Sequence, residues 1–371
     1  MKIAILTLSY PPGCGGSGYY AKDLAEALAK HGHEVTVYTP AKSGLTTEYG
    51  VDIIQLTQLR PHVLMFNLHL LAISKVITKK KFDLVIHNEV AGSLMPSYFY
   101  KTSNSVMAMH HQTDEEHTTS YWRKIKVNMV QILQDRMVKK SSAVTFLTEY
   151  IRKDAVTRYH LNKPTFIVPC IVNDNFSPDN DIKSKDLTIF YPSGAGDNFE
   201  RKGIGYFLPV FKSVYEKNPN IKLVISGGNV KSVDMIKVLA SRLGILKVVE
   251  TTSNLSFDKV MRYFNSADIV VFTSKYEGFG RPVIEALQNG KPLITSNTGV
   301  APEVIKSGEN GYISNSAQET EVFLTRLIRD RDLRNRVAKM AKQTSLLRFT
   351  ESKIVKKIED IKVLLDENSN N

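Results

Sequence analysis

With 371 residues, the chain is long enough for two domains of about 170 residues each. Its apolar content of 42% and charged content of 23% are ordinary for a globular protein, and two cysteines cannot supply a disulfide framework or a cysteine-rich metal site. The net charge of +12 comes with no nucleic-acid-binding motif, so an anionic membrane surface is the expected polyanionic partner and nucleic acid is not.

The expected location is cytoplasmic. The N-terminal run Lys2 to Leu8 carries no cleavage site, and no stretch reaches the roughly 18 apolar residues of a membrane span. Cys14 and Cys170 are most simply reduced thiols. We expect peripheral contact with the inner face of the cell membrane.

The first half of the chain alternates strand-like and helical patterns. An apolar strand at Ile3 to Leu8 is followed by a glycine-rich loop, Pro11 to Gly18, and a periodic helix, Tyr20 to Lys30. Further strands are expected at residues 35–38, 52–56, 83–87, 106–110, 143–147 and 165–168. This alternation predicts an α/β domain with a doubly wound parallel sheet.

A second set of the same kind follows a polar segment. Residues 173–185 are rich in turn-forming residues and have no period, which is typical of an interdomain linker. The second set of strands is expected near residues 187–191, 223–226, 248–250, 268–273 and 293–295. A last helical pattern runs from Phe349 to about Leu365.

The first glycine loop fits the dinucleotide fingerprint G-x-G-x-x-G at Gly13, Gly15 and Gly18. No acidic residue follows the second strand, where a ribose-binding carboxylate would stand, so a hydride-transfer enzyme is not expected. The loop either approaches a diphosphate with its backbone or only allows close packing of strand and helix.

The most informative segment is Glu-Gly-Phe-Gly-Arg-Pro-Val-Ile-Glu, residues 277–285. It follows a β-branched run and opens a helix with Pro282 at its first position. Backbone N–H groups at Gly278 and Gly280 can receive phosphate oxygens there. Glu285, in the first turn, can accept two hydrogen bonds from a ribose diol, while Glu277 faces the group on the far phosphate. The alternative is a helix cap and an exposed acid.

This segment closely resembles the donor-site signature of retaining glycosyltransferases of family 4. Residues 255–268 before it, and 297–304 and 310–312 after it, continue the likeness, which covers nearly the whole chain and is stronger in its second half. The resemblance implies the GT-B architecture, two Rossmann-like domains facing each other across a cleft. It implies an acceptor-side domain, residues 1–173, a donor-binding domain, residues 186–348, and a C-terminal helix, 349–366, that crosses back to the first domain.

The resemblance also assigns site residues. Arg201 and Lys202 match the family's phosphate-binding pair, although many members place the arginine several residues earlier. His110, with His111 as the alternative, matches a histidine near the donor sugar. The donor-binding residues that the likeness implies are Gly15, Gly16, Gly278, Phe279, Gly280, Pro282, Val283 and Glu285. With Glu277, the catalytic set is His110, Glu277, Arg201 and Lys202.

No metal or other cofactor is expected, because the cationic pair can stabilise the departing diphosphate. The two Asp-x-Asp sequences, residues 179–181 and 330–332, follow no strand and are not interpreted as metal sites.

The segment Tyr121 to Lys140 has six basic residues and one acid beside Trp122, on a helix with an apolar stripe. We expect its apolar stripe to pack on the sheet, and its basic face is the candidate for contact with anionic lipid.

The combined interpretation is a retaining, metal-independent hexosyltransferase. It would move a hexose or N-acetylhexosamine from a nucleotide-sugar, UDP-linked in preference to GDP-linked, to a polysaccharide, lipopolysaccharide or glycolipid. One alternative is a nucleotide-sugar 2-epimerase of the same architecture, which an assay without acceptor would reveal. The other is a nucleic-acid-binding protein that uses the charge of +12, which a salt-dependent gel shift would expose.

Overall fold

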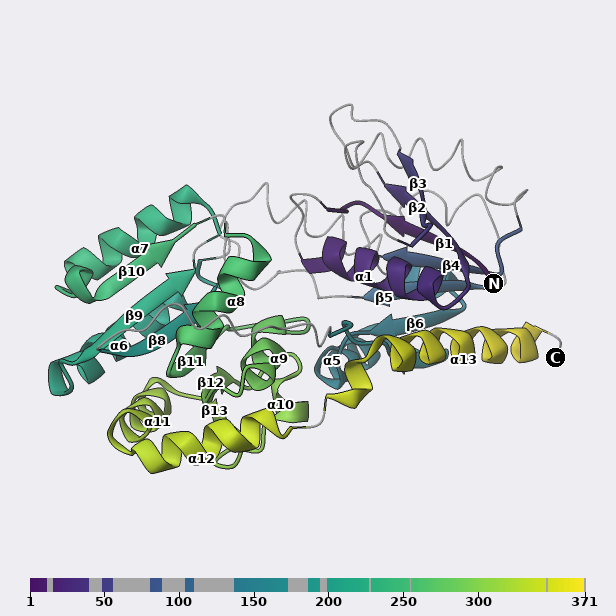
Figure 1. Cartoon of the computed structure of the whole chain (residues 1–371). Coiled ribbons are helices and arrows are strands. Elements are labelled where there is room, and N and C mark those ends of the chain that lie inside the picture. Colours follow the sequence, from purple (N-terminus) through teal and green to yellow (C-terminus); the bar gives the residue numbers. More distant parts are fainter. Residues whose placement is uncertain are drawn as a thin grey trace. The chain divides into compact units, whose positions relative to one another are not determined.

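The structure is a computed structural model that describes residues 1–11, 16–39, 49–55, 81–88, 104–109, 137–172, 186–193, 199–226, 228–253, 255–344 and 346–369. The chain forms two compact units, Met1–Asn173 with Leu346–Asn371, and Asp174–Ser345. Each unit contains a parallel sheet with helices packed against it (Figure 1). The doubly wound α/β fold predicted from the alternating patterns is confirmed in both units.

Within the described residues, the sheet of the first unit has the order β3-β2-β1-β4-β5-β6-β7, with all neighbours parallel. Its strands are β1 (Lys2–Thr7), β2 (Glu34–Thr39), β3 (Asp52–Gln55), β4 (Leu84–Asn88), β5 (Ser105–Met109), β6 (Ala143–Phe146) and β7 (Thr165–Ile167). The central strands β4 and β5 are buried throughout, including the polar His87 and Asn88 at the end of β4 and Ser105 at the start of β5. All carboxyl ends therefore lie at one edge of the sheet.

Three named helices cover the described part of this unit: α1 (Gly16–Lys30), α5 (Glu149–Tyr159) and α13 (Glu351–Ser369). Helix α1 begins four residues before the expected Tyr20, so Gly16 lies in its first turn and not in a loop. Helix α13 packs on α1 and is held there by an ion pair of Lys30 with Glu351, at 2.9 Å, and by a hydrogen bond between His33 Nε2 and Glu359 Oε1, at 3.1 Å.

The sheet of the second unit has the order β10-β9-β8-β11-β12-β13, again with parallel neighbours. Its strands are β8 (Leu187–Pro192), β9 (Ile221–Ser226), β10 (Val249–Thr252), β11 (Ile269–Phe272), β12 (Leu293–Ser296) and β13 (Tyr312–Ser314). The sequence predicted all of these except β13.

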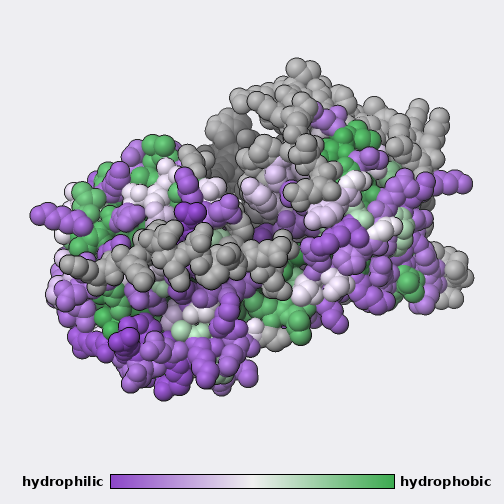
Figure 2. Space-filling model, viewed as in Figure 1, coloured by the Kyte–Doolittle hydropathy of each residue, from purple (hydrophilic) through white to green (hydrophobic). Residues whose placement is uncertain are grey.

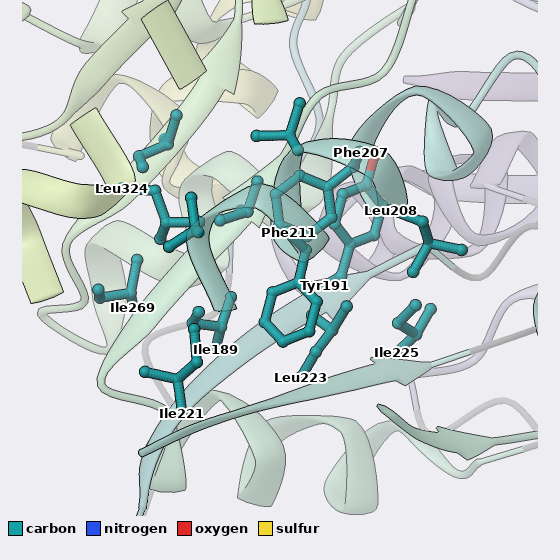
Figure 3. Packing of buried hydrophobic residues seen from close by; sticks show 14 of the residues in the cluster. Ile189, Tyr191, Phe207, Leu208, Phe211, Ile221, Leu223, Ile225, Ile269 and Leu324 are labelled. Atoms are coloured by element: carbon teal, nitrogen blue, oxygen red, sulfur yellow. The ribbon is translucent and has the colours of Figure 1, made fainter. Parts of the chain in front are cut away.

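Helices surround this second sheet (Figure 1). They are α6 (Ile204–Lys217), α7 (Val230–Arg242), α8 (Phe257–Ser266), α9 (Arg281–Gln288), α10 (Ala301–Val304), α11 (Ala317–Arg329) and α12 (Arg331–Lys342), with short 3-10 turns at Leu246–Val248 here and at Leu347–Phe349 in the first unit. In the core (Figure 3), Phe207 of α6 stacks on Tyr191 of β8 with ring centroids 5.1 Å apart. This packing fixes the start of α6. Arg201 and Lys202 immediately precede this helix.

Hydrophilic side chains dominate the visible surface over α12 (Figure 2), where Arg331, Arg336 and Lys339 are exposed. The expected basic helix of residues 121–140 lies largely outside the described residues; its last turn, 137–140, is helical, with Met137 buried and Lys140 exposed. Among the described helices, none has both the length and the apolar character needed to cross a membrane.

Candidate functional site

The turn between β11 and α9 carries the two predicted glutamates. Gly280 precedes the helix in the left-handed conformation, with φ of 84°, which glycine adopts without strain. The helix therefore begins at Arg281, so Pro282 is its second residue and not its first. For the same reason Glu285 lies at the start of the second turn, which corrects the expectation of a first-turn carboxylate.

Arg201 and Lys202 converge on Glu277, although 76 and 75 residues separate them from it in sequence. Arg201 Nη1 lies 3.1 Å and Lys202 Nζ 2.8 Å from the same carboxylate oxygen, Oε1. Arg201 Nη1 also donates to the carbonyl of Tyr276 at 2.8 Å, and Lys202 Nζ stands 5.3 Å from the centre of the Phe272 ring. Three of the predicted catalytic residues thus form one cluster.

The cluster is poorly accessible to water, with side-chain exposures of 22% for Arg201, 14% for Lys202 and 10% for Glu277. Burial would raise the pKa of Glu277, but the charges of Lys202 and Arg201 and hydrogen bonds from Lys202 and Ser274 outweigh it. Its pKa therefore lies below the usual range and the carboxylate is ionised at neutral pH. Two cations against one anion leave an excess positive charge that can receive a phosphate oxygen.

Glu285 has a different environment from Glu277. Burial raises its pKa, and the charges of Arg281 and Lys202 offset only part of that effect. Arg281 Nε stands 3.9 Å from Glu285 Oε1. A buried carboxylate of this kind gains most from a ligand that donates two hydrogen bonds, as a ribose diol does.

The other predicted donor-binding residues lie around the start of α9. Phe279 and Val283 are 4% and 1% exposed, so their side chains belong to the core and can serve a ligand only through the main chain. Gly278, Gly280 and Pro282 complete the same turn. The segment after β12 supports this turn, because the Val300 N–H donates a hydrogen bond to the Phe279 carbonyl at 2.8 Å.

Gly299 explains why this second segment can approach so closely. A Cβ added at Gly299 would stand 2.5 Å from the Phe279 carbonyl oxygen, and its φ of 57° is left-handed. Any larger residue there would push the turn away from β12. The sequence included residues 297–304 in the resemblance without assigning them this supporting role.

Of the site residues expected in the first unit, the structure describes only Gly16. Gly16 is the first residue of α1, and nothing lies within 4 Å of a Cβ built on it. Gly15, His110 and His111 lie outside the described residues, as does the linker 173–185.

Neutral hydrogen bonds hold the start of α1 against the carboxyl ends of β1 and β4. Asn88 Nδ2 donates to Thr7 Oγ1 at 3.0 Å and to the carbonyl of Ser17 at 3.1 Å, and Ser9 Oγ lies 3.2 Å from Ser17 Oγ. Sequence reasoning missed Asn88; its position at the end of a buried strand was the available signal.

Sequence reasoning also missed Ser274 and Tyr191, whose hydroxyls contact the basic cluster. Neither belongs to a recognised motif, and each also contacts the segment of the basic pair, Ser274 across 73 residues and Tyr191 across 11. The second Asp-x-Asp sequence has a structural use, because Asp330 Oδ1 accepts from the Leu333 N–H at 2.8 Å and caps α12. Across the described residues, no three His, Cys, Asp or Glu side chains are grouped to hold a metal ion.

Two family models match the chain in tandem. The model for glycosyl transferases group 1 matches residues 172–344, and the model for Glycosyltransferase Family 4 matches residues 14–176. The two together span both units and include the whole cluster around Glu277.

Individual proteins agree with the family models. The MMP α-(1→4)-mannosyltransferase of Mycolicibacterium hassiacum is 23% identical over 350 residues, 82% of this chain and 83% of its own length. The structure of HepE from Anabaena with UDP-glucose has a TM-score of 0.77 at 19% identity, covering 97% of this chain and 98% of that one. WaaG, a glycosyltransferase involved in lipopolysaccharide biosynthesis, has a TM-score of 0.76 at 18% identity, covering 96% and 99%.

The fold and these matches define a glycosyltransferase with the GT-B architecture. Within that class, the chain belongs to glycosyltransferase family 4, with the group 1 glycosyl transferase domain in its second unit.

Proposed function

We propose that this glycosyltransferase is a retaining, metal-independent enzyme that takes a hexose or N-acetylhexosamine from a nucleotide-sugar. The observation that carries the proposal is the convergence of Arg201 and Lys202 on one oxygen of Glu277, beside the N-terminal turn of α9. Cations are disfavoured near helix N-termini unless an anion is bound there. A diphosphate is the anion that a nucleotide-sugar brings.

Different residues bind different parts of the donor. The diphosphate lies on the N–H groups of the Gly278–Gly280 turn, Glu285 accepts from the ribose hydroxyls, and Glu277 lies toward the sugar. When the bond between the anomeric carbon and the β-phosphate oxygen breaks, the electron pair stays on that oxygen. Arg201 and Lys202 stabilise the added negative charge, which is the role that a metal plays in other transferases.

Retention of configuration is proposed to come from attack on the face that the diphosphate leaves. The acceptor hydroxyl oxygen forms the new bond to the anomeric carbon, and its proton passes to the departing phosphate oxygen. This route requires no enzyme nucleophile. His110 is proposed to donate a hydrogen bond to a hydroxyl of the sugar.

The donor and acceptor classes are supported by similar proteins. HepE was captured with UDP-glucose, which favours a UDP-sugar, and a GDP-mannose-dependent phosphatidylinositol monomannoside mannosyltransferase of Mycolicibacterium smegmatis, a similar protein, keeps a GDP-sugar open as the alternative. The link of WaaG to lipopolysaccharide biosynthesis favours a glycan or glycolipid acceptor. An acceptor of that kind is consistent with a basic chain that contacts an anionic membrane.

The first experiment compares thermal shifts with UDP, GDP, ADP and their sugars, and then follows transfer to candidate lipid acceptors by mass spectrometry. The expected result is stabilisation by one nucleotide series, then a product with the α-configuration of its donor. The same assay in EDTA should retain full activity. Strict dependence on Mg²⁺ or Mn²⁺, or an inverted product, would contradict the proposal.

A further inference from the structure

Ser274 stands at the centre of the basic cluster. It is fully buried, and its Oγ lies 2.7 Å from Glu277 Oε1, 3.0 Å from the Arg201 carbonyl oxygen and 3.1 Å from the Tyr276 carbonyl oxygen. One hydroxyl proton is therefore shared among three acceptors. The Ser274 hydroxyl therefore links the Glu277 carboxylate, which pairs with both Arg201 and Lys202, to the main chain of Arg201.

Tyr191 makes the corresponding contact with the backbone of Lys202. Its hydroxyl, at the end of β8, donates to the Lys202 carbonyl at 2.6 Å and lies 3.1 Å from Thr273 Oγ1. Burial raises the pKa of Tyr191, so the phenol keeps its proton and remains a donor. Its ring is stacked on Phe207 in the core, so the hydroxyl is held in a fixed position.

The backbones of the two segments are also in direct contact. The Lys275 N–H donates to the Arg201 carbonyl at 2.8 Å. A Cβ added at Gly203, whose φ is 72°, would stand 2.0 Å from the Thr273 carbonyl oxygen. Residues 201–203 therefore lie directly on residues 273–277, with no room for a side chain at Gly203.

We propose that the buried hydroxyls of Ser274 and Tyr191 are positioning groups that hold Arg201 and Lys202 ready for the outer phosphate of the donor. The inference rests on the proposed function, because it assigns these hydroxyls to the same diphosphate site. Long cationic side chains lose conformational freedom when they bind an anion. Fixing their backbones and their shared counter-ion beforehand reduces that loss and aims both charges at one point.

Nucleotides with and without the outer phosphate separate this role from simple folding support. In Ser274→Ala, the affinity for UDP should fall about tenfold while the affinity for UMP stays within about twofold of wild type, measured by calorimetry. Turnover should fall by more than the donor KM rises, because the phosphate charge is largest during bond breaking. If the wild type binds GDP instead, GDP and GMP replace this pair.

Tyr191→Phe is the second variant, because it keeps the ring and removes only the hydroxyl. It should show the same selective loss and decides the question if Ser274→Ala does not fold. Ser314→Ala is the matched control: it removes a buried hydroxyl that donates to the Ser316 carbonyl at 2.9 Å and lies 2.7 Å from Thr320 Oγ1, on β13 of the same sheet.

Three results would overturn the inference. They are folded variants that keep the wild-type preference for UDP over UMP, equal losses for both nucleotides, or the same selective loss in Ser314→Ala. A wild-type protein that binds no nucleoside diphosphate would refute the proposed function itself, and is recognised before any variant is made.

Discussion

The carboxyl edges of the two sheets carry different chemistry. At the edge of the second sheet, three cations, Arg201, Lys202 and Arg281, pair with two largely buried carboxylates, Glu277 and Glu285, around the start of α9. At the described edge of the first sheet, Thr7, Ser9, Ser17 and Asn88 form neutral hydrogen bonds. His87 beside them is also neutral, because burial lowers its pKa to about 4.

The contrast bears on which part of the proposed donor each edge could recognise. A diphosphate needs cations, whereas sugar hydroxyls are recognised by neutral donors and acceptors. Under the proposed function, the second unit would bind the diphosphate with its own cations, and the described residues of the first unit offer only neutral groups at their edge. Variants in the charged edge should consequently have the larger effects.

Lys202→Ala should give the largest effect. Removing the ammonium group leaves the departing phosphate with one cation, and turnover should fall by about 100- to 1000-fold. The measurement is steady-state kinetics with the donor that the thermal-shift screen selects. Lys212→Ala is the control, since Lys212 pairs with Glu216 at 3.6 Å on the surface of the same unit. A loss of less than about tenfold in Lys202→Ala would show that the charged edge does not dominate the chemistry.

Glu285→Ala should have a smaller effect, on binding. If Glu285 accepts both ribose hydroxyls, its loss removes charge-assisted hydrogen bonds worth about 1.5–3 kcal/mol each. Nucleotide affinity should weaken by at least about tenfold, while the melting temperature changes little. Glu216→Ala, an exposed carboxylate of α6, provides the calorimetric control. Unchanged affinity in Glu285→Ala would remove Glu285 from the donor site.

The sequence predicted the fold because its signals are local. Buried parallel strands such as β4, β8 and β11 are rich in apolar residues, and β11 is apolar throughout. The ends of elements were less predictable. Helix α1 extends into the glycine-rich segment, where Asn88 binds the Ser17 carbonyl in its first turn. This tertiary contact has no signal near Gly16 in the sequence.

The part of the site that was predicted from the sequence is the part that lies in recognisable motifs. The Glu277–Glu285 segment was recognisable from its own residues, and the resemblance supplied Arg201 and Lys202. Ser274 and Tyr191 were not found in this way, since no motif includes them and their hydrogen bonds to the backbones of Arg201 and Lys202 span 73 and 11 residues. Only the folded second sheet brings those groups together.

The smallest expected effect sharpens the contrast between the two glutamates of the charged edge. The pKa of Glu277 is lowered, so its ionised form stabilises the fold above the ordinary glutamate pKa, and this stability is lost as pH falls through the lowered value. Glu277→Gln should therefore lower the free energy of unfolding at neutral pH, by about 1–3 kcal/mol.

Glu285 should behave in the opposite way. Its pKa is raised, so ionisation opposes folding as pH rises through that value, and Glu285→Gln should raise the melting temperature slightly at neutral pH. This gain should disappear as pH falls below the ordinary glutamate pKa, where both states are protonated. Thermal unfolding of the two variants and the wild type, from about pH 8 to about pH 4, measures both signs. Shifts of the same sign at neutral pH would mean that the two carboxylates share one environment, and the division between a charge-holding and a ribose-binding glutamate would fail.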